Sequence, residues 1–385
     1  MRPPLRDDLR ALPIPGAAEA EERAWDVVRL AHAERLRVHR PRSRRPLVLA
    51  FAAAAVVVAA ALSPPGLAVL GSVRDALAPE RHVKTALVTL PAPGRLLVTT
   101  GDGAWVVSAD GSKRRLGPYR DAAWSPHGLF VAAVRGHQLA ALEPDGTAHW
   151  TLTRTPAPRL PAWNAPDGYR IAYLSGTTLR VVNGDGTGDR LLARAVAAVR
   201  PAWRPGREHV LAYVRADGTV VVGGADTGRM LWTRRWPVAP RQLAWSDDGR
   251  RLLVVAPTRV RVYDARGRAV GFDDPPAAAR ASAAAFRPGT HVVVEIRRHG
   301  GQSTAFVLES GGTIFTTPGI LQGLAWSPDG RWLLLGWRSA DQWLFVRVEP
   351  KRRTVLTFGA ISDAFDPGAA GRAGYPRLAG WCCGR

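Results

Sequence analysis

Short apolar runs alternate with turn-forming residues from about residue 85 to the end of the chain. The stretch GLAWSPDGRWLLLGW (323–337) is typical, because a Ser-Pro-Asp-Gly turn separates two apolar runs. Apolar runs of this length, bounded by Asp, Gly and Pro, indicate β-strands joined by tight turns. The stretch therefore predicts a β-hairpin, and its architectural meaning depends on whether it recurs.

The hairpin recurs at a nearly constant interval. Successive copies can be aligned on one aromatic residue, and the intervals between these residues are 39, 40, 42, 41 and 40. The aligned residues are Trp124, Trp163, Trp203, Trp245, Phe286 and Trp326. A fixed period near 40 with short strands predicts a β-propeller or a linear array.

Every repeat has the same internal order of strands. The apolar runs that follow the turn, and predict second strands, are 129–134, 170–175, 209–214, 251–256, 291–296 and 332–337. The runs that predict third strands are 138–143, 178–183, 219–224, 259–264, 304–309 and 343–348. Pairs such as Asp145-Gly146 and Asp185-Gly186 then suit the hairpin that leads to a short fourth strand. Four antiparallel strands in about 40 residues make one propeller blade.

The recurrent aromatic residue has a structural explanation. In a propeller, blades pack face to face, and a large flat ring fills the wedge between them. Burying one such ring contributes about 2–3 kcal/mol. We therefore expect these rings to lie between blades and not to form a base-stacking platform.

The two ends of the chain are expected to complete one blade together. Residues 95–117 supply second, third and fourth strands but only a poor first strand. The missing strand has two C-terminal candidates, AISDAFDPG (360–368) and PRLAGWCC (376–383), and either would close the ring and leave no unpaired edge. The sequence thus predicts an all-β, seven-bladed propeller. Six blades result if one unit departs from the pattern, and eight if TLPAPG (89–94) is a first strand.

A different pattern precedes the repeats. The segment PLVLAFAAAAVVVAAAL (46–62) is almost purely apolar and uncharged, and Ser-Pro-Pro-Gly follows it. At the α-helical rise it spans about 26 Å, the short end of what crosses a bilayer. We predict a single transmembrane helix over 46–63, which contacts the lipid bilayer, and a linker over 64–84.

The flanking charges predict the orientation of this helix. Four arginines precede it closely, whereas the first charge beyond it is Arg74. By the positive-inside rule, residues 1–45 are cytoplasmic and the propeller, residues 85–385, is extracytoplasmic, so the protein is a single-pass protein of the cell membrane. A cleaved signal peptide, a twin-arginine export signal at 43–48 and a buried soluble helix are the alternatives.

The basic cytoplasmic segment contains AAEAEERAWDVVRLAHAERLRV (17–38), whose composition favours a helix. Glutamates near its start suit the positive end of the helix dipole. Trp25 and Val28 form a weak apolar stripe. The helix is either a solvated juxtamembrane element or a docking site for a cytosolic partner.

Composition narrows the functional classes. The net charge of +21 comes almost wholly from arginine, since Lys84, Lys113 and Lys351 are the lysines of the chain. These charges are dispersed along the sequence and not clustered as in a nucleic-acid-binding protein. We therefore expect an arginine-rich solvated surface that favours anionic partners, with no nucleic acid among them.

The cysteines are Cys382 and Cys383, adjacent at the end of the chain. They cannot build a disulfide framework, and neighbouring cysteines seldom bond each other because the backbone between them is strained. We expect small packed residues in the last strand. Intermolecular pairing or a reactive thiol is the alternative.

No catalytic motif is present. The histidines have no i, i+4 pair, and neither a G-x-S-x-G elbow nor a G-x-x-x-x-G-K-[ST] loop occurs. NGDGTGD (183–189) loosely resembles a calcium loop, but Thr187 replaces an expected ligand and no closing glutamate follows, so a plain hairpin turn is expected. We predict no catalytic, cofactor-binding or metal-binding residue, and no enzyme. Polar residues from different blades could still meet in the central channel.

The SPDGR turn, the apolar run after it and the later Asp-Gly turn resemble the TolB-like propeller repeats of exported bacterial proteins. The resemblance covers about residues 85–385. The architecture is WD-repeat-like, although the blades do not repeat the Gly-His and Trp-Asp pairs of true WD repeats. Residues 143–152 and 224–232 look like quinoprotein propeller repeats, but these two blades alone do so. The resemblance implies a scaffold that binds other proteins in the cell envelope.

Together these patterns predict a membrane-anchored, extracytoplasmic propeller that acts as a binding or scaffold module. Its partner is expected to be an envelope protein or an anionic surface polymer. One alternative is a transmembrane sensor whose cytosolic segment holds a regulator, as anti-sigma proteins do. The other is a propeller enzyme with a site centred in the channel, which an arginine-lined channel would count against.

Overall fold

The computed structural model describes residues 89–385 apart from residues 207, 349–352, 367–373 and 384–385. The predictions of a helix over 17–38, a transmembrane helix over 46–63 and a linker over 64–84 lie outside the described residues. In the part of the chain that is described, no helix combines the length and the apolar character needed to span a bilayer.

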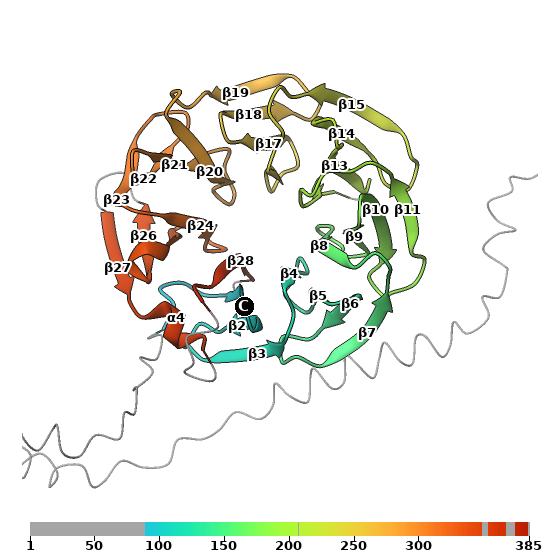
Figure 1. The fold of residues 1–385 in the computed structure, drawn as a ribbon, viewed down its shortest axis with the longest axis horizontal. Helices are drawn as coiled ribbons and strands as arrows, with labels where there is room; N and C mark the ends of the chain where they lie inside the picture. Colours follow the sequence, from blue (N-terminus) through green and yellow to red (C-terminus); the bar gives the residue numbers. More distant parts are fainter. Residues whose placement is uncertain (1–88, 207, 349–352, 367–373, 384–385) are drawn as a thin grey trace, which may run out of the picture. The chain divides into compact units, whose positions relative to one another are not determined.

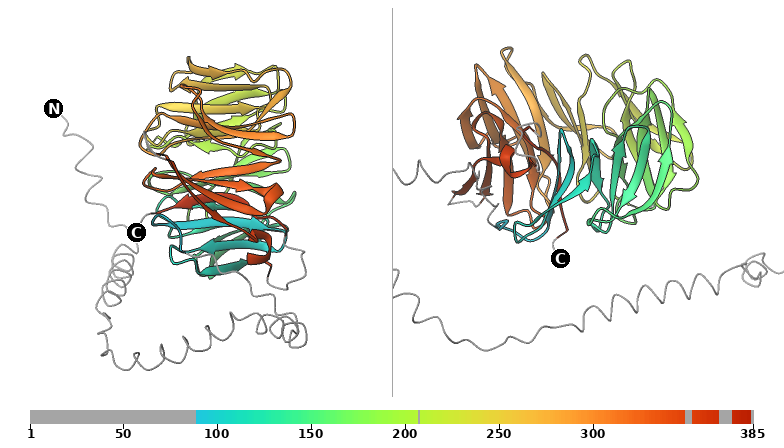
Figure 2. Two further views of the ribbon diagram at one scale, coloured as in Figure 1. Left: turned by 90° about the vertical axis from the view of Figure 1, so that its left-hand side faces the viewer. Right: turned by 60° about the horizontal axis from the view of Figure 1, so that its bottom comes forward.

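The described residues form seven four-stranded antiparallel sheets, arranged as blades around a central opening (Figure 1). Seen from the side, the strands run from one face of the ring to the other (Figure 2). The first strand of each blade lies nearest the centre and the fourth lies at the periphery (Figure 1). The prediction of an all-β, seven-bladed propeller is confirmed, and the counts of six and eight are wrong.

The blades are numbered here in chain order, and each is given from its inner to its outer strand. Blade 1 contains β28 (Arg377–Cys382), β1 (Arg95–Thr100), β2 (Gly103–Val107) and β3 (Lys113–Gly117). Blade 2 contains β4 (Asp121–Trp124), β5 (Val131–Arg135), β6 (Gln138–Leu142) and β7 (Ala148–Thr153). Blade 3 contains β8 (Pro158–Trp163), β9 (Arg170–Ser175), β10 (Thr178–Asn183) and β11 (Arg190–Ala193).

The remaining blades follow the same order. Blade 4 contains β12 (Ala202–Trp203), β13 (Val210–Val214), β14 (Thr219–Gly224) and β15 (Met230–Arg235). Blade 5 contains β16 (Gln242–Trp245), β17 (Arg251–Ala256), β18 (Arg259–Asp264) and β19 (Ala269–Asp273). Blade 6 contains β20 (Ala279–Phe286), β21 (Val293–His299), β22 (Gln302–Val307) and β23 (Thr313–Pro318). Blade 7 contains β24 (Leu321–Trp326), β25 (Trp332–Trp337), β26 (Gln342–Val348) and β27 (Arg353–Phe358), with η1 (Arg338–Ala340) and α4 (Ile361–Ala364).

Most predicted second and third strands agree with the observed ones within two residues, and blade 6 shows the clearest shift. Its strands β21 and β22 pair as far as His299 and Gln302, beyond the predicted end at 296 and before the predicted start at 304. Gly300 and Gly301 both have positive φ, at +52° and +83°. Glycine adopts such angles without steric cost, so a two-residue turn forms and extends both strands toward it.

The second candidate closes the ring. Strand β28 pairs with β1, with Trp381 opposite Leu96, so the two ends of the described chain share blade 1. The first candidate is wrong as a strand, because residues 361–364 form the short helix α4. The backbone NH and the hydroxyl of Ser362 both donate to Asp341 Oδ1, which holds this turn of helix against blade 7.

Residues 89–94 form no strand either, and lead directly into β1. The backbone NH of Leu90 donates to Ala109 O, at the turn between β2 and β3, instead of joining a ladder. Residues 89–94 therefore supply no first strand for an eighth blade. Phe365 is fully buried and packs 5.4 Å from the ring of Trp343, so its apolar character serves the core.

The recurrent aromatic residues pack between blades, as expected. Trp203 donates from Nε1 to Ala162 O of the preceding blade at 2.9 Å, and Trp245 donates to Ala202 O at 3.2 Å. The guanidinium of Arg204 lies 5.8 Å from the ring centre of Trp245 and donates to a backbone carbonyl in the same blade as that ring. These two interfaces therefore combine apolar burial with a hydrogen bond to a backbone carbonyl of the preceding blade, whereas the indole nitrogens of Trp124, Trp163 and Trp326 are buried with no such bond among the described residues.

The cysteine expectation is wrong in one respect, because Cys382 and Cys383 are joined by a disulfide. Cys382 ends β28, and Cys383 follows in the left-handed region at φ +63°. Within a strand, neighbouring side chains point to opposite faces. Because β28 ends between the two cysteines, their side chains do not follow this alternation. A Cβ at Gly128 would lie 2.7 Å from Cys383 Sγ, so the pair packs closely against the first turn of blade 2.

Candidate binding site

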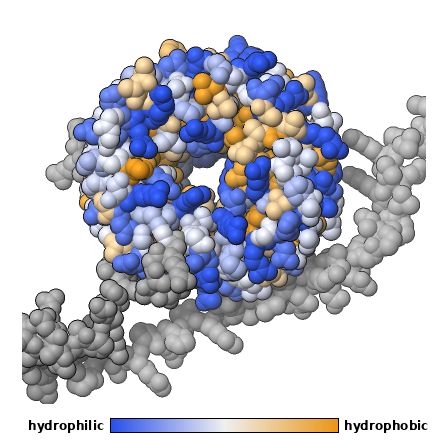
Figure 3. Space-filling model, viewed as in Figure 1, coloured by the Kyte–Doolittle hydropathy of each residue, from blue (hydrophilic) through white to orange (hydrophobic). Residues whose placement is uncertain are grey.

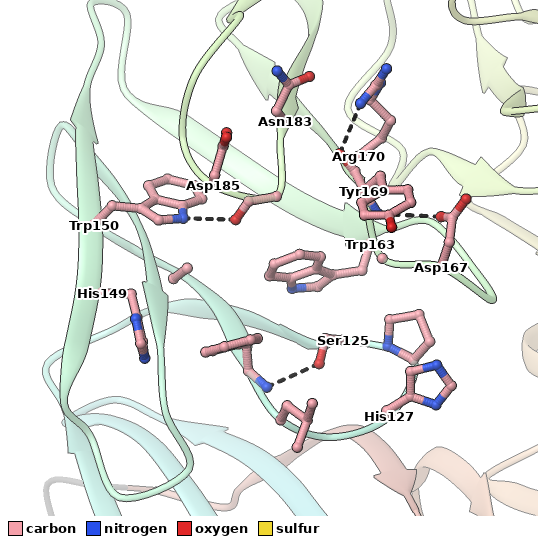
Figure 4. Close-up of a pocket in the computed structure, with 16 residues that line it drawn as sticks. Ser125, His127, His149, Trp150, Trp163, Asp167, Tyr169, Arg170, Asn183 and Asp185 are labelled. Carbon is pink, nitrogen blue, oxygen red and sulfur yellow. Dashed lines mark hydrogen bonds between the residues drawn. The ribbon is translucent and has the colours of Figure 1, made fainter. Parts of the chain in front are cut away.

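A cavity of about 690 Å³ opens between blades 2 and 3 (Figure 4). It lies on the face of the ring where the turns from first to second strands and from third to fourth strands emerge. Three such turns and the outer strand β7 supply its walls. The labelled side chains that line it are Ser125, His127, His149, Trp150, Trp163, Asp167, Tyr169, Arg170, Asn183 and Asp185 (Figure 4).

The first-to-second-strand turns have a fixed shape because a polar residue follows the blade aromatic. In blade 2, Ser125 Oγ accepts from the backbone NH of Phe130 at 2.9 Å. In blade 3, Asn164 Oδ1 accepts from the backbone NH of Arg170 at 2.6 Å. Such local bonds to backbone donors favour tight turns. They place Phe130 and its neighbour Leu129 at the wall of the cavity.

The NGDGTGD segment forms the hairpin turn between β10 and β11, which confirms the turn prediction. Asp185 Oδ1 accepts from the backbone NH of Thr187 at 2.9 Å and from its hydroxyl at 2.7 Å. These bonds lower the pKa of Asp185, the backbone bond most, and use this oxygen within the turn. The carboxylate therefore stabilises the turn that forms one wall of the cavity.

Trp150 on β7 joins blade 2 to this turn of blade 3. Its Nε1 donates to Gly184 O at 2.8 Å (Figure 4). A Cβ added at Gly186 would lie 2.7 Å from the indole, and Gly186 has φ +86°. Only glycine combines that backbone angle with so close an approach of a ring. The side of the cavity is thus a rigid contact between blades.

The deeper lining is aromatic. Phe130 and Trp163 stack with ring centres 6.5 Å apart and planes 22° from parallel. His149 meets Phe130 edge-on at 4.8 Å. At the mouth, Leu129 is 62% exposed and Tyr169 is 65% exposed. Exposed apolar side chains next to an aromatic hollow are typical of a surface that another molecule covers.

One small side chain helps to open the cavity. Ala141 lies opposite Trp150 in the β6–β7 pairing and lines the cavity. The equivalent interface between blades 4 and 5 has Val222 opposite Trp232. Trp232 docks in the same way, donating from Nε1 to Ala265 O at 3.1 Å. A larger side chain is therefore compatible with the docked tryptophan and fills space that Ala141 leaves empty.

A second size difference acts at the same place. Tyr263 in β18 packs 5.6 Å from the ring of Trp232 and occupies the interface between blades 4 and 5. The residue at the corresponding register in β10 is Val182, which pairs with Ile171 as Tyr263 pairs with Leu252. Ala141 lines the cavity, whereas Val182 belongs to the buried cluster against which Trp150 packs, so both smaller residues lie next to the docked tryptophan.

Charged groups at the rim are engaged with the protein. Burial disfavours the ionised form of Asp167, but bonds from Tyr169 NH and the Asn164 amide outweigh it and lower the pKa of Asp167. Its other oxygen lies 3.3 Å from His209 Nε2. Arg170 donates from Nε to Asp226 Oδ1 at 3.3 Å. Among the described residues, these rim charges are therefore paired within the protein.

The cavity between blades 2 and 3 can bind and orient an apolar chemical group. The sequence analysis predicted none of its lining residues as a binding site. Within the described ranges no cluster of His, Cys, Asp and Glu side chains could hold a metal ion. Each lining residue belongs to an ordinary turn or strand when its own repeat is considered alone. The one available signal was the loss of bulk at residues 141 and 182 when the blades are aligned with one another.

Comparisons with known proteins show the fold. No protein-family model matches the chain, and no curated protein matches it. Among solved structures, the chain is similar to a protein chain in a crystal structure of the mitotic checkpoint complex, at 17% identity and a TM-score of 0.50. The match covers 62% of this chain and 79% of the other chain. It is also similar to the C-terminal WD40 domain of Sif2, at 14% identity and a TM-score of 0.52, over 68% and 80%. The chain is a seven-bladed β-propeller with WD40-like structural neighbours.

Proposed function

We propose that this protein is a non-catalytic binding module, anchored in a bacterial membrane by residues 46–63. Residues 1–45 are cytoplasmic in this proposal, and the propeller binds another protein of the cell envelope. Four arginines before an uncharged apolar segment support the anchor and its orientation. The TolB-like repeat pattern supports a place in the envelope.

The observation that carries the binding role is the aromatic cavity between blades 2 and 3. Its walls are held by turn hydrogen bonds and by the docked Trp150, so it is formed before any partner arrives. A preformed hollow costs little ordering entropy on binding. Its exposed rim residues, Leu129 and Tyr169, suit an apolar or aromatic side chain presented by a protein partner.

Site-specific photocrosslinking of the full-length protein in its own membranes tests this role. A photoreactive amino acid at Tyr169 is expected to give a discrete protein adduct. The matched control is the same amino acid at Phe272, which is 73% exposed on the outer strand of blade 5. Equal adducts at both positions, or none at Tyr169, would contradict a binding site in the cavity.

The variant Ala141→Val supplies a second control, because valine already occupies the equivalent position 222. The added methyl groups fill part of the cavity while the fold is retained. We expect the Tyr169 adduct to fall by at least fivefold, with thermal unfolding changed by no more than a few degrees. An unchanged adduct in this variant would show that the partner does not enter the cavity.

Reporter fusions in a bacterial host test the anchor separately. An alkaline phosphatase fused after residue 385 is expected to be active, because the enzyme matures only outside the cytoplasm. The same reporter fused after residue 45 is expected to be inactive. The reverse pattern would place the propeller in the cytoplasm.

A further inference from the structure

A second cavity, of about 480 Å³, lies at the junction of blades 7, 1 and 2. Arg120, Arg338 and Arg377 line it, together with Gln322 and Tyr375. Arg120 directly precedes β4, whereas the aromatic cavity lies beyond the other end of that strand. Because strands run from face to face of the ring (Figure 2), the two cavities open on opposite faces.

Ring closure brings these arginines together. Arg377 is the first residue of β28, Arg338 begins η1 after β25, and Arg120 belongs to the next blade. Tyr375 leads into β28 and donates from its hydroxyl to Gln342 O at 2.7 Å. A Cβ at position 336 would lie 3.0 Å from that hydroxyl, so Gly336 allows the crossing. The cavity therefore depends on the same strand that seals the ring.

The described lining of the cavity carries three positive charges. The side chains of Arg120, Arg338 and Arg377 are exposed, and within the described part of the chain they have no hydrogen-bond or ion-pair partner. Among the described residues, no carboxylate lines the cavity. Of the acidic residues nearby in sequence, Asp121 pairs with Arg200 at 3.1 Å, whereas Asp341 accepts from the neutral Ser362 and keeps its charge, which acts on Tyr375. Three like charges on one hollow repel one another, and an anion would relieve that repulsion.

The basic residues also follow the repeat. Arginine stands four residues before the blade aromatic in several blades, at Arg120, Arg159, Arg241 and Arg377, and Gln322 holds that position in blade 7. These positions fall at or just before the first strands, which lie nearest the central opening (Figure 1). Figure 3 shows the molecule hollowed at the centre of the ring, with hydrophilic residues on parts of the rim.

Two of these arginines do not contribute to the second cavity. Arg159 donates to Gly176 O at 2.7 Å and is thereby used within its own blade. Arg241 is exposed but lies outside the cavity. At the junction of blades 7, 1 and 2, Arg338 adds a third guanidinium that does not follow the repeat.

We propose that the cavity formed by Arg120, Arg338 and Arg377 binds a phosphate-bearing anion. A guanidinium presents parallel N–H donors that match phosphate oxygens, and it stays charged at any physiological pH. Linked phosphates bring several negative charges into one cavity and can therefore balance three guanidiniums. An isolated carboxylate brings a single negative charge. The Gln322 amide supplies a further neutral donor. The site is separate from the aromatic cavity. It rests on the proposed function in one respect: the anion is expected to come from outside the cytoplasm.

Calorimetry on the full-length protein in mild detergent tests the site, with inorganic tripolyphosphate as the probe. Tricarballylate, which carries three carboxylates, is the comparator. We expect saturable tripolyphosphate binding at low salt that weakens steeply as salt rises, and at least tenfold weaker binding of tricarballylate. Equal affinity for the two probes overturns the phosphate assignment. Absence of tripolyphosphate binding overturns the site.

The substitutions Arg338→Gln and Arg377→Gln are expected to weaken tripolyphosphate at least tenfold each. Arg194→Gln, at an exposed arginine outside the cavity, removes the same charge and is expected to change affinity less than twofold. Equal losses in all three variants would reduce the binding to general charge attraction and overturn the site. Thermal unfolding without ligand checks that each variant is folded, and Arg377→Lys tests whether charge alone restores binding.

The two proposals fail separately. Ala141→Val is expected to leave tripolyphosphate affinity unchanged, and Arg338→Gln is expected to leave the Tyr169 crosslink unchanged. Loss of phosphate binding with the crosslink intact would refute the arginine cavity alone. Loss of the crosslink with phosphate binding intact would refute the protein-binding role alone.

Discussion

The substitution Glu295→Gln is expected to change how the stability of the propeller depends on pH. Glu295 lies on β21 with no exposed surface, and both carboxylate oxygens lack a hydrogen-bond partner within the described residues. It shares a strand face with Val293, which packs against blade 5. Arg297 Nε lies within ion-pair distance of Glu295 Oε1, at 3.5 Å, and another nitrogen of the same guanidinium donates to Asp273. Burial accordingly raises the pKa of Glu295 to about 8 from 4.5.

The magnitude follows from the proton balance. Between pH 4.5 and pH 8 the folded protein keeps the Glu295 proton, whereas the unfolded chain has released it. Each pH unit in this window then lowers the free energy of unfolding by about 1.4 kcal/mol through this one group. Raising the pH from 5 to 7.5 therefore costs the wild type about 3 kcal/mol that the neutral glutamine does not lose.

Urea unfolding of the full-length protein at pH 5 and pH 7.5, followed by tryptophan fluorescence, measures this difference. The variant is expected to gain about 3 kcal/mol relative to wild type between the two pH values. Glu309→Gln is the matched control, because Glu309 is exposed in the same blade and its pair with Arg251 spans 3.5 Å. A variant that shifts stability equally at both pH values would refute an uncharged, buried Glu295.

Two further predictions concern the contacts that hold the ring together. Asp189→Asn replaces a buried carboxylate, which accepts from Arg180, Tyr173 and Arg154, with a neutral amide. The substitution should cost about 2 kcal/mol of unfolding free energy at pH 7. Burial opposes its charge, but the Arg180 and Tyr173 bonds lower the pKa of Asp189, so this loss should shrink as the pH falls below 4 in urea titrations. Trp381→Ala removes a ring packed 5.6 Å from Phe345 and should cost about 3 kcal/mol, with faster hydrogen exchange at the β1 amides that face β28. Unchanged β1 protection would refute the closing role of that ring.

Much of the fold could be predicted because strands and turns depend on local sequence. Runs such as 251–256 and 332–337 coincide with observed strands, since apolar alternation and Asp-Gly turns act over a few residues. The period near 40 then required blades, and the blade aromatics were correctly placed between them. Errors arose where two segments had similar local patterns. The segment 360–368 matched the strand pattern, but Asp341, a residue distant in sequence, holds it as α4.

The candidate sites depend on contacts between repeats, which no single repeat encodes. The aromatic cavity lies at an interface where Ala141 and Val182 stand at the positions that the larger Val222 and Tyr263 hold between blades 4 and 5. The charges of Arg120, Arg338 and Arg377 are dispersed in sequence, which is why the sequence predicted no cluster. Closure by β28 places them around one hollow.

The order of hydrophobic and polar residues by itself determined the all-β class, the repeat of about 40 residues and the apolar segment at 46–62, and it favoured seven blades over six or eight. These follow from interactions between near neighbours, which any stretch of chain carries with it. Only the tertiary structure decided which C-terminal segment seals the ring, where the cavities open and which charges meet. Those outcomes depend on side chains tens to hundreds of residues apart, whose proximity exists only once the ring has closed.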